Sequence, residues 1–109
     1  MLIEQIKPIW TLDKAIEKVR ELNQIANGFG YHLGIGGSVL IKGESHNDVD
    51  IYAFPLHTGI EIDMDGFLIA LQNKYFQLEE IQDPDYNPED SFARLFRIDE
   101  TIDLFIIEE

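Results

Sequence analysis

The chain has 109 residues, a common size for one globular domain and too short for two separate cores. Hydrophobic residues make up 45% of it and charged residues 27%, as in ordinary globular proteins, so extended disorder and fibrous repeats are disfavoured. Acidic residues number 21 against 8 basic ones, and the formal charge of -13 would repel phosphates, which disfavours nonspecific binding to nucleic acid.

Cysteine is absent, which excludes disulfides and thiolate metal sites. No apolar run approaches the roughly 18 residues of a membrane span. The N-terminal residues also lack the basic start and long apolar stretch of a signal peptide. We therefore expect a cytoplasmic protein with no membrane partner, built as a single domain over residues 1–109.

Two long helices are predicted from apolar residues that recur at helical spacing. The first runs from Thr11 to Ala26, with Thr11 in the N-capping position and Gly28 placed to end the helix. The second runs from about Met64 and extends to Leu78. A shorter helix is expected after the glycine turn that precedes residue 39.

Four strands are predicted from alternating or continuous apolar residues. They cover residues 31–35, 48–54, 92–98 and 101–107. Asp99-Glu100 would form a tight hairpin turn, and residues 82–88 are a loop by composition. This order of elements predicts an α+β fold with α/β layers, in which helices cover one face of a mixed sheet of about four strands.

Asp48 and Asp50 form the first candidate for a chemical site. They lie two residues apart on a predicted strand, so both side chains leave the same face, about 7 Å apart at Cα. Two carboxylates this close would be pushed toward protonation unless a cation compensates, which indicates a metal or a basic partner. The alternative is an exposed strand edge at which water screens both charges.

Asp103 adds a third carboxylate, within the sequence Thr-Ile-Asp-Leu-Phe-Ile-Ile. Its neighbours favour burial, and a buried unpaired charge is costly. If its strand lies beside that of Asp48 and Asp50, three carboxylates meet, and oxygen ligands of this kind suit magnesium. The alternative is a residue at a strand end that faces solvent.

Candidate phosphate ligands lie in a glycine turn and among nearby basic residues. Gly36-Gly37-Ser38 precedes the short helix and can direct backbone N–H groups and the Ser38 hydroxyl toward a phosphate, although an ordinary turn is the alternative. Lys42, Arg94 and Arg97 are further candidates. Arg94 and Arg97 fall on opposite faces of a regular strand, so we expect at most one to face the site. For all three, a solvated salt-bridging surface is the alternative.

Together, Gly36-Gly37-Ser38, Asp48-Val49-Asp50 and Ile102-Asp103-Leu104 resemble the three-part signature of the nucleotidyltransferases of the DNA polymerase beta superfamily. This resemblance covers most of the chain and implies the nucleotidyltransferase fold. It also implies that Ser38 and the glycines hold a nucleoside triphosphate. Asp48 and Asp50 would bind magnesium, two ions being expected, and Asp103 would complete the site and help to activate the acceptor hydroxyl.

The implied reaction transfers a nucleoside monophosphate, AMP from ATP in our interpretation, to a hydroxyl of a protein, an RNA or a small molecule. Small members of this superfamily often act as antitoxins paired with a helical HEPN-type RNase toxin, which is our preferred setting by resemblance. The alternative is a partner-binding module that keeps the fold without catalysis. A homodimer is also compatible with the sequence.

Overall fold

The computed structural model describes residues 10–45, 48–57, 59–75, 77–81, 93–99 and 101–107. Three sequence predictions lie outside these residues: the loop at 82–88, the first residue of the strand predicted to begin at 92, and the contribution of Glu100 to the hairpin turn. No helix in the described ranges is long and apolar enough to cross a membrane.

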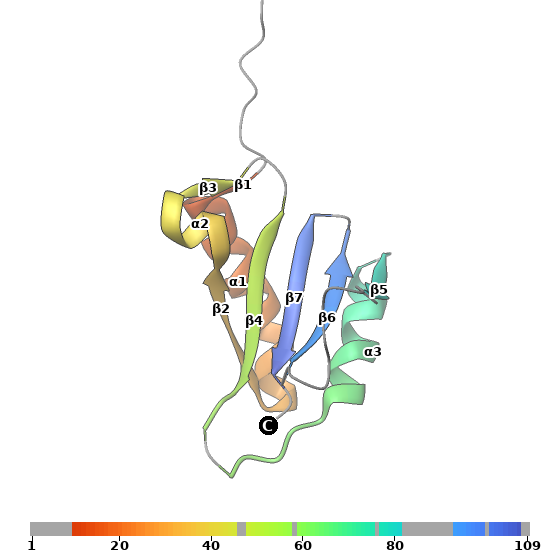
Figure 1. Cartoon of the computed structure of the whole chain (residues 1–109). Helices are drawn as coiled ribbons and strands as arrows, with labels where there is room; N and C mark the ends of the chain where they lie inside the picture. Colours follow the sequence, from red (N-terminus) through yellow and green to blue (C-terminus); the bar gives the residue numbers. More distant parts are fainter. Residues whose placement is uncertain are drawn as a thin grey trace, which may run out of the picture.

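A mixed five-stranded sheet is the centre of the fold (Figure 1), and its strands follow the order β2-β4-β7-β6-β5. The central strands β4 and β7 are parallel, and every other neighbouring pair is antiparallel. A separate two-residue ladder joins β1 to β3. The predicted α+β class and mixed sheet are therefore confirmed. The strands are β1 (Trp10–Thr11), β2 (Tyr31–Gly36), β3 (Glu44–Ser45), β4 (Val49–Pro55), β5 (Leu78–Glu80), β6 (Ala93–Ile98) and β7 (Ile102–Ile107).

The two long helices, α1 (Leu12–Ala26) and α3 (Met64–Lys74), cover the same face of the sheet, the far face in Figure 1. The short helix α2 (Gly37–Lys42) follows β2 directly, at one end of the sheet. Alternate strand residues point toward α1 and α3 and form one core, because successive side chains of a strand leave opposite faces. The fully buried members of this core include Leu22, Ile51, Phe67, Leu71 and Leu104.

Both ends of α1 agree with the sequence prediction, because the helix ends at Ala26, but Gly28 is not the residue that stops the helical path. Thr11 is the N-cap, and its Oγ1 accepts a hydrogen bond from the Lys14 backbone N–H at 3.3 Å. Gly28 does not stop the helical path, because a 3₁₀ turn, η1 (Asn27–Phe29), continues it. Gly30 ends it instead, with φ 92°, a left-handed conformation that glycine adopts without strain.

The predicted second helix is too long. The observed helix α3 ends at Lys74, and the next residue, Tyr75, has an extended backbone. Leu78, predicted as helical, instead begins β5 and pairs with Ile98 of β6. Backbone pairing with β6 outweighs the helical spacing here. This difference supplies the fifth strand that the sequence prediction lacked.

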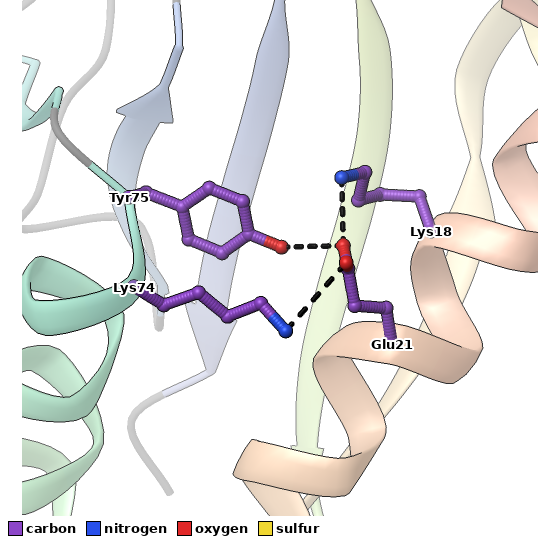
Figure 2. Close-up of polar contacts among 4 residues, drawn as sticks. All are labelled: Lys18, Glu21, Lys74 and Tyr75. Carbon is purple, nitrogen blue, oxygen red and sulfur yellow. Dashed lines mark hydrogen bonds and ion pairs between the residues drawn. The ribbon is translucent and has the colours of Figure 1, made fainter.

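A polar cluster links α1 to the C-terminal end of α3 (Figure 2). Glu21 of α1 accepts hydrogen bonds from Lys18 Nζ and from Tyr75 Oη, each at 2.7 Å. Lys74 Nζ lies 3.5 Å from the other carboxylate oxygen. Because Tyr75 is the C-cap of α3, the cluster fixes the point at which α3 gives way to extended chain.

Candidate functional site

One transverse row of residues crosses the face of the sheet opposite α1 and α3. Its members are direct neighbours on adjacent strands, so their Cα atoms lie about 4.8 Å apart from one strand to the next. We call this row the polar row. In strand order it consists of Gly36, Asp50, Asp103, Arg97 and Glu79.

The alternation along β4 places Asp50 on this outer face. Val49 and Ile51 are fully buried in the core, whereas Asp50, between them, is partly exposed. Asp48 lies just before β4, and the next residue along the chain donates its backbone N–H to the Thr101 carbonyl at 2.9 Å. That bond joins the first residue of β4 to the residue just before β7.

Arg97 joins two of the three carboxylates. Its Nε donates a hydrogen bond to Asp103 Oδ1 at 3.0 Å, and its Nη2 lies 3.7 Å from Asp48 Oδ2. The Asp103 side chain is 14% exposed, compared with 33% for Asp48 and 40% for Arg97. Arg97 therefore lies at the solvent side of a carboxylate that is largely withdrawn from water.

The carboxylates perturb one another. Burial raises the pKa of Asp48, the negative charge of Asp103 raises it further, and Arg97 opposes the rise. Burial likewise raises the pKa of Asp50, followed by the charges of Asp103 and Asp48. The hydrogen bond to Asp103 raises the pKa of Arg97 and keeps it charged. Arg97 contacts two of the three carboxylates, so one positive charge opposes three neighbouring carboxyl groups.

The glycine turn lies directly against this cluster. Gly37 has φ 63°, and a Cβ added there would overlap Asp50 Oδ2. A Cβ on Gly36 would overlap the ring of Tyr52. Each glycine is therefore required where it stands, because it lets the backbone of the turn approach an acidic side chain and an aromatic ring on β4.

The other predicted phosphate ligands lie at different places. Ser38 belongs to α2, but its side chain, and with it the predicted role of its hydroxyl, is outside the described part of the structure. Lys42 is the last residue of α2, at the opposite end of that helix from the glycine turn, and is exposed. Arg94 is on the helix-covered side, where it contacts Met64 Sδ at 3.2 Å and Glu80 at 2.8 Å. Arg97 alone among the basic candidates contacts the carboxylates.

The donor set fits a hard divalent cation such as magnesium in its chemistry, because all three side chains offer carboxylate oxygens. Within the described residues, however, no group of three or more Asp, Glu, His or Cys side chains already converges as a metal-binding cluster. Arg97 is instead the cation that contacts Asp48 and Asp103.

Two residues beside the site were given no role from the sequence. Glu79 lies next to Arg97 in the polar row, but no strand was predicted at this position, which directly follows the predicted second helix. Tyr52 lies two residues after Asp50, and this spacing already places the two side chains on one face. The same spacing is the signal by which Tyr52 could have been identified as part of the site.

A scan against protein-family models finds no family that matches the chain. A search of curated proteins likewise finds no match. Any inference about activity therefore has to come from the residues and their arrangement.

Proposed function

We propose that this protein is a magnesium-dependent nucleotidyltransferase that transfers a nucleoside monophosphate, AMP from ATP, to a hydroxyl group of an acceptor. The observation that carries this proposal is the register of the sheet. It aligns Asp50 with Asp103 and brings both beside Asp48 and the Gly36-Gly37 turn. The nucleotidyltransferase fold and its family are part of the same proposal.

In the proposed reaction the acceptor oxygen attacks the α-phosphorus, and the bond from that phosphorus to the pyrophosphate oxygen breaks. Magnesium, with two ions expected, supplies charge neutralisation for the attacking and leaving oxygens. Asp48, Asp50 and Asp103 would hold the metal, and Asp103 would also accept the proton of the hydroxyl. The backbone N–H groups of Gly36 and Gly37 would donate hydrogen bonds to the triphosphate.

Arg97 has two roles in this proposal. Without nucleotide it balances Asp103 and Asp48, which would otherwise repel each other. With nucleotide, the same guanidinium turns toward the phosphates, for which its planar donor set is well suited. Lys42 is retained as a predicted phosphate contact, and because it is at the far end of α2, it would need a longer reach than Arg97.

A second candidate function is a partner-binding module without catalysis. The pairing of Arg97 with Asp103 and Asp48 favours it, because an internal cation stabilises the carboxylates in the absence of any metal. Under this alternative, substitution of the carboxylates leaves binding of the partner intact.

For either function we propose a basic, helical protein partner such as a HEPN-type toxin. The charge of -13 complements a basic surface. Exposed apolar side chains on α2 offer a contact that is not purely electrostatic, since Leu40 is 61% exposed and Ile41 is 81% exposed. A second copy of the chain could bind through the same side chains, so a homodimer is also part of this proposal.

The decisive experiment follows radioactive label from ATP. Purified protein is incubated with magnesium, a cell extract as the source of acceptors, and ATP labelled at either the α- or the γ-phosphate. Nucleotide transfer predicts that macromolecules gain label from α-labelled ATP only, whereas phosphoryl transfer would use the γ-label. Binding of ATP with magnesium is measured in parallel by calorimetry.

The variants Asp50→Asn and Asp103→Asn keep the side-chain size and remove a metal-binding charge, and both should abolish transfer. Asp65→Asn, at an exposed position in the first turn of α3, removes the same charge away from the site and should leave transfer unchanged. Magnesium-dependent binding without transfer would favour the binding module. If ATP does not bind to the folded wild-type protein, the nucleotidyltransferase proposal is wrong.

A further inference from the structure

Beside the polar row, the outer face of the sheet carries aromatic rings. Tyr52 of β4 and Phe105 of β7 are register neighbours, and their rings stack at 4.8 Å between centroids with 13° between their planes. Phe54 continues the group at 6.3 Å from Tyr52, and His32 lies 6.0 Å from Phe54. Neither α1 nor α3 covers this face (Figure 1). The aromatic group therefore lies beside the carboxylates on one continuous surface.

The strand next to Tyr52 has no side chain at the corresponding position. Gly34 of β2 is the register partner of Tyr52, and a Cβ built on Gly34 meets no atom of the described residues within 4 Å. Phe105, Tyr52 and Gly34 are neighbours on three adjacent strands, β7, β4 and β2. The rings of Phe105 and Tyr52 lie side by side, and among the described residues no side chain lies over Gly34. A flat ring could occupy that place and extend the stack by one member.

This open position has a defined relation to the proposed phosphate site. Tyr52 follows Asp50 by two residues, so it lies about 7 Å further along the strand on the same face. The edge of its ring lies over Gly36, in the turn proposed to bind the triphosphate. One sugar unit separates the phosphates of a nucleotide from its base, and the strand spacing of about 7 Å between the two positions is comparable with the length of such a unit.

We propose that Tyr52 and Gly34 form the nucleobase-binding position, in which the base of the nucleoside triphosphate stacks on Tyr52 over Gly34. This inference rests on the proposed function, because it takes the triphosphate to lie at Asp50 and the glycine turn. Aromatic stacking tolerates any base, since every base has a π-face. The protein is therefore expected to bind ATP, GTP, CTP and UTP with affinities within about tenfold of one another.

The test compares two ligands that share phosphates and differ in the base. ATP and inorganic tripolyphosphate are each titrated with magnesium into the full chain by calorimetry. Loss of base stacking weakens affinity by roughly 5- to 100-fold. Tyr52→Leu should therefore weaken ATP binding to this extent and leave tripolyphosphate binding unchanged, whereas Tyr52→Phe keeps the ring and should retain ATP affinity.

Gly34→Val tests the open position without removing any contact. Gly34 is a strand residue facing open space, so a β-branched side chain should be tolerated there and keep the melting temperature. Gly34→Val should weaken the binding of ATP and leave the binding of tripolyphosphate unchanged. Phe54→Leu is the control, because it removes a ring from the same strand and face two residues further from Asp50. It should leave the affinity for both ligands unchanged.

The outcomes separate this inference from the proposal on which it rests. If the wild-type protein binds tripolyphosphate and ATP equally, or if Tyr52→Leu and Gly34→Val leave ATP binding intact, the base lies elsewhere and only this inference is overturned. If Phe54→Leu weakens ATP binding as much as Tyr52→Leu does, the position assigned to the base is wrong. If neither ligand binds, both proposals are overturned.

Discussion

The polar cluster at Glu21 should contribute measurably to stability, and the variant Glu21→Gln tests this. The pKa of Glu21 is lowered from 4.5 to about 2, first by the hydrogen bond from Lys18 and then by that from Tyr75. A fall of this size sets an upper limit of about 3 kcal/mol on the stabilisation. Because the Glu21 side chain is 38% exposed, water screens these contacts, and we expect about 1 kcal/mol.

The effect should depend on pH in a defined direction. The pKa of Glu21 is lower in the folded protein than in the unfolded chain, so the ionised carboxylate stabilises the fold. The contribution is complete above pH 4.5 and is lost as the pH falls from 4.5 toward 2. The free energies of unfolding of the wild type and Glu21→Gln should therefore differ at pH 7 and converge in acid.

The assay is urea denaturation followed by circular dichroism, repeated from pH 7 down to pH 3. At pH 7 a loss of about 1 kcal/mol corresponds to a fall in melting temperature of about 4 °C or more for a domain of this size. Taking the difference between the two proteins removes the general effect of protonating the other carboxylates. Glu17→Gln is the control, because it removes the same charge from an exposed position one turn earlier in α1.

Two results would refute this reasoning. If Glu21→Gln and Glu17→Gln lower stability equally at pH 7, net charge rather than the cluster is responsible. If the difference between the wild type and Glu21→Gln persists unchanged at pH 3, the ionised carboxylate is not the stabilising group.

Two further substitutions probe the site and the core. Gly37→Ala should destabilise the protein by about 1–3 kcal/mol, since it places a Cβ at φ 63° against Asp50. The substitution should also weaken nucleotide binding by the protein that remains folded. Thermal denaturation measures the loss of stability, and calorimetry measures the loss of binding. Leu22→Ala should lower the free energy of unfolding by about 2–5 kcal/mol, because the leucine is fully buried between α1 and the sheet. An unchanged free energy of unfolding in urea would contradict the packing described for this position.

Much of the fold could be predicted from the sequence because its signals are local. The spacing of apolar residues identifies α1 and the start of α3, and Thr11 lies where an N-cap is needed. The alternation along β4 correctly separates buried Ile51 from partly exposed Asp50. These features depend on a few neighbouring residues and not on distant parts of the chain.

The parts that were wrong depend on contacts between distant segments. Leu78 fits a helical pattern, yet its place is set by pairing with Ile98 of β6. Gly28 is suited to end the helical path, but a 3₁₀ turn continues that path after α1 as far as Gly30, whose backbone passes close to the Glu61 carbonyl. Neither partner can be read from the local sequence.

The candidate site shows the same division. The sequence singled out Asp48, Asp50 and Asp103 by residue type, and a conditional strand pairing was needed to bring them together. The structure supplies that pairing in the register of β4 with β7. The contacts of Arg97 with two carboxylates could not be anticipated, because they depend on the exact pairing of β6 with β7.

The parallel pairing of β4 with β7 also has a consequence for the order of folding. β7 lies between β4 and β6, so the segment carrying Asp103 must enter the middle of the sheet from a part of the chain far from Asp50. Closing such a long loop is slow compared with forming a helix or a hairpin. The β6–β7 hairpin is a local unit, and the candidate site is complete only when that hairpin pairs with β4.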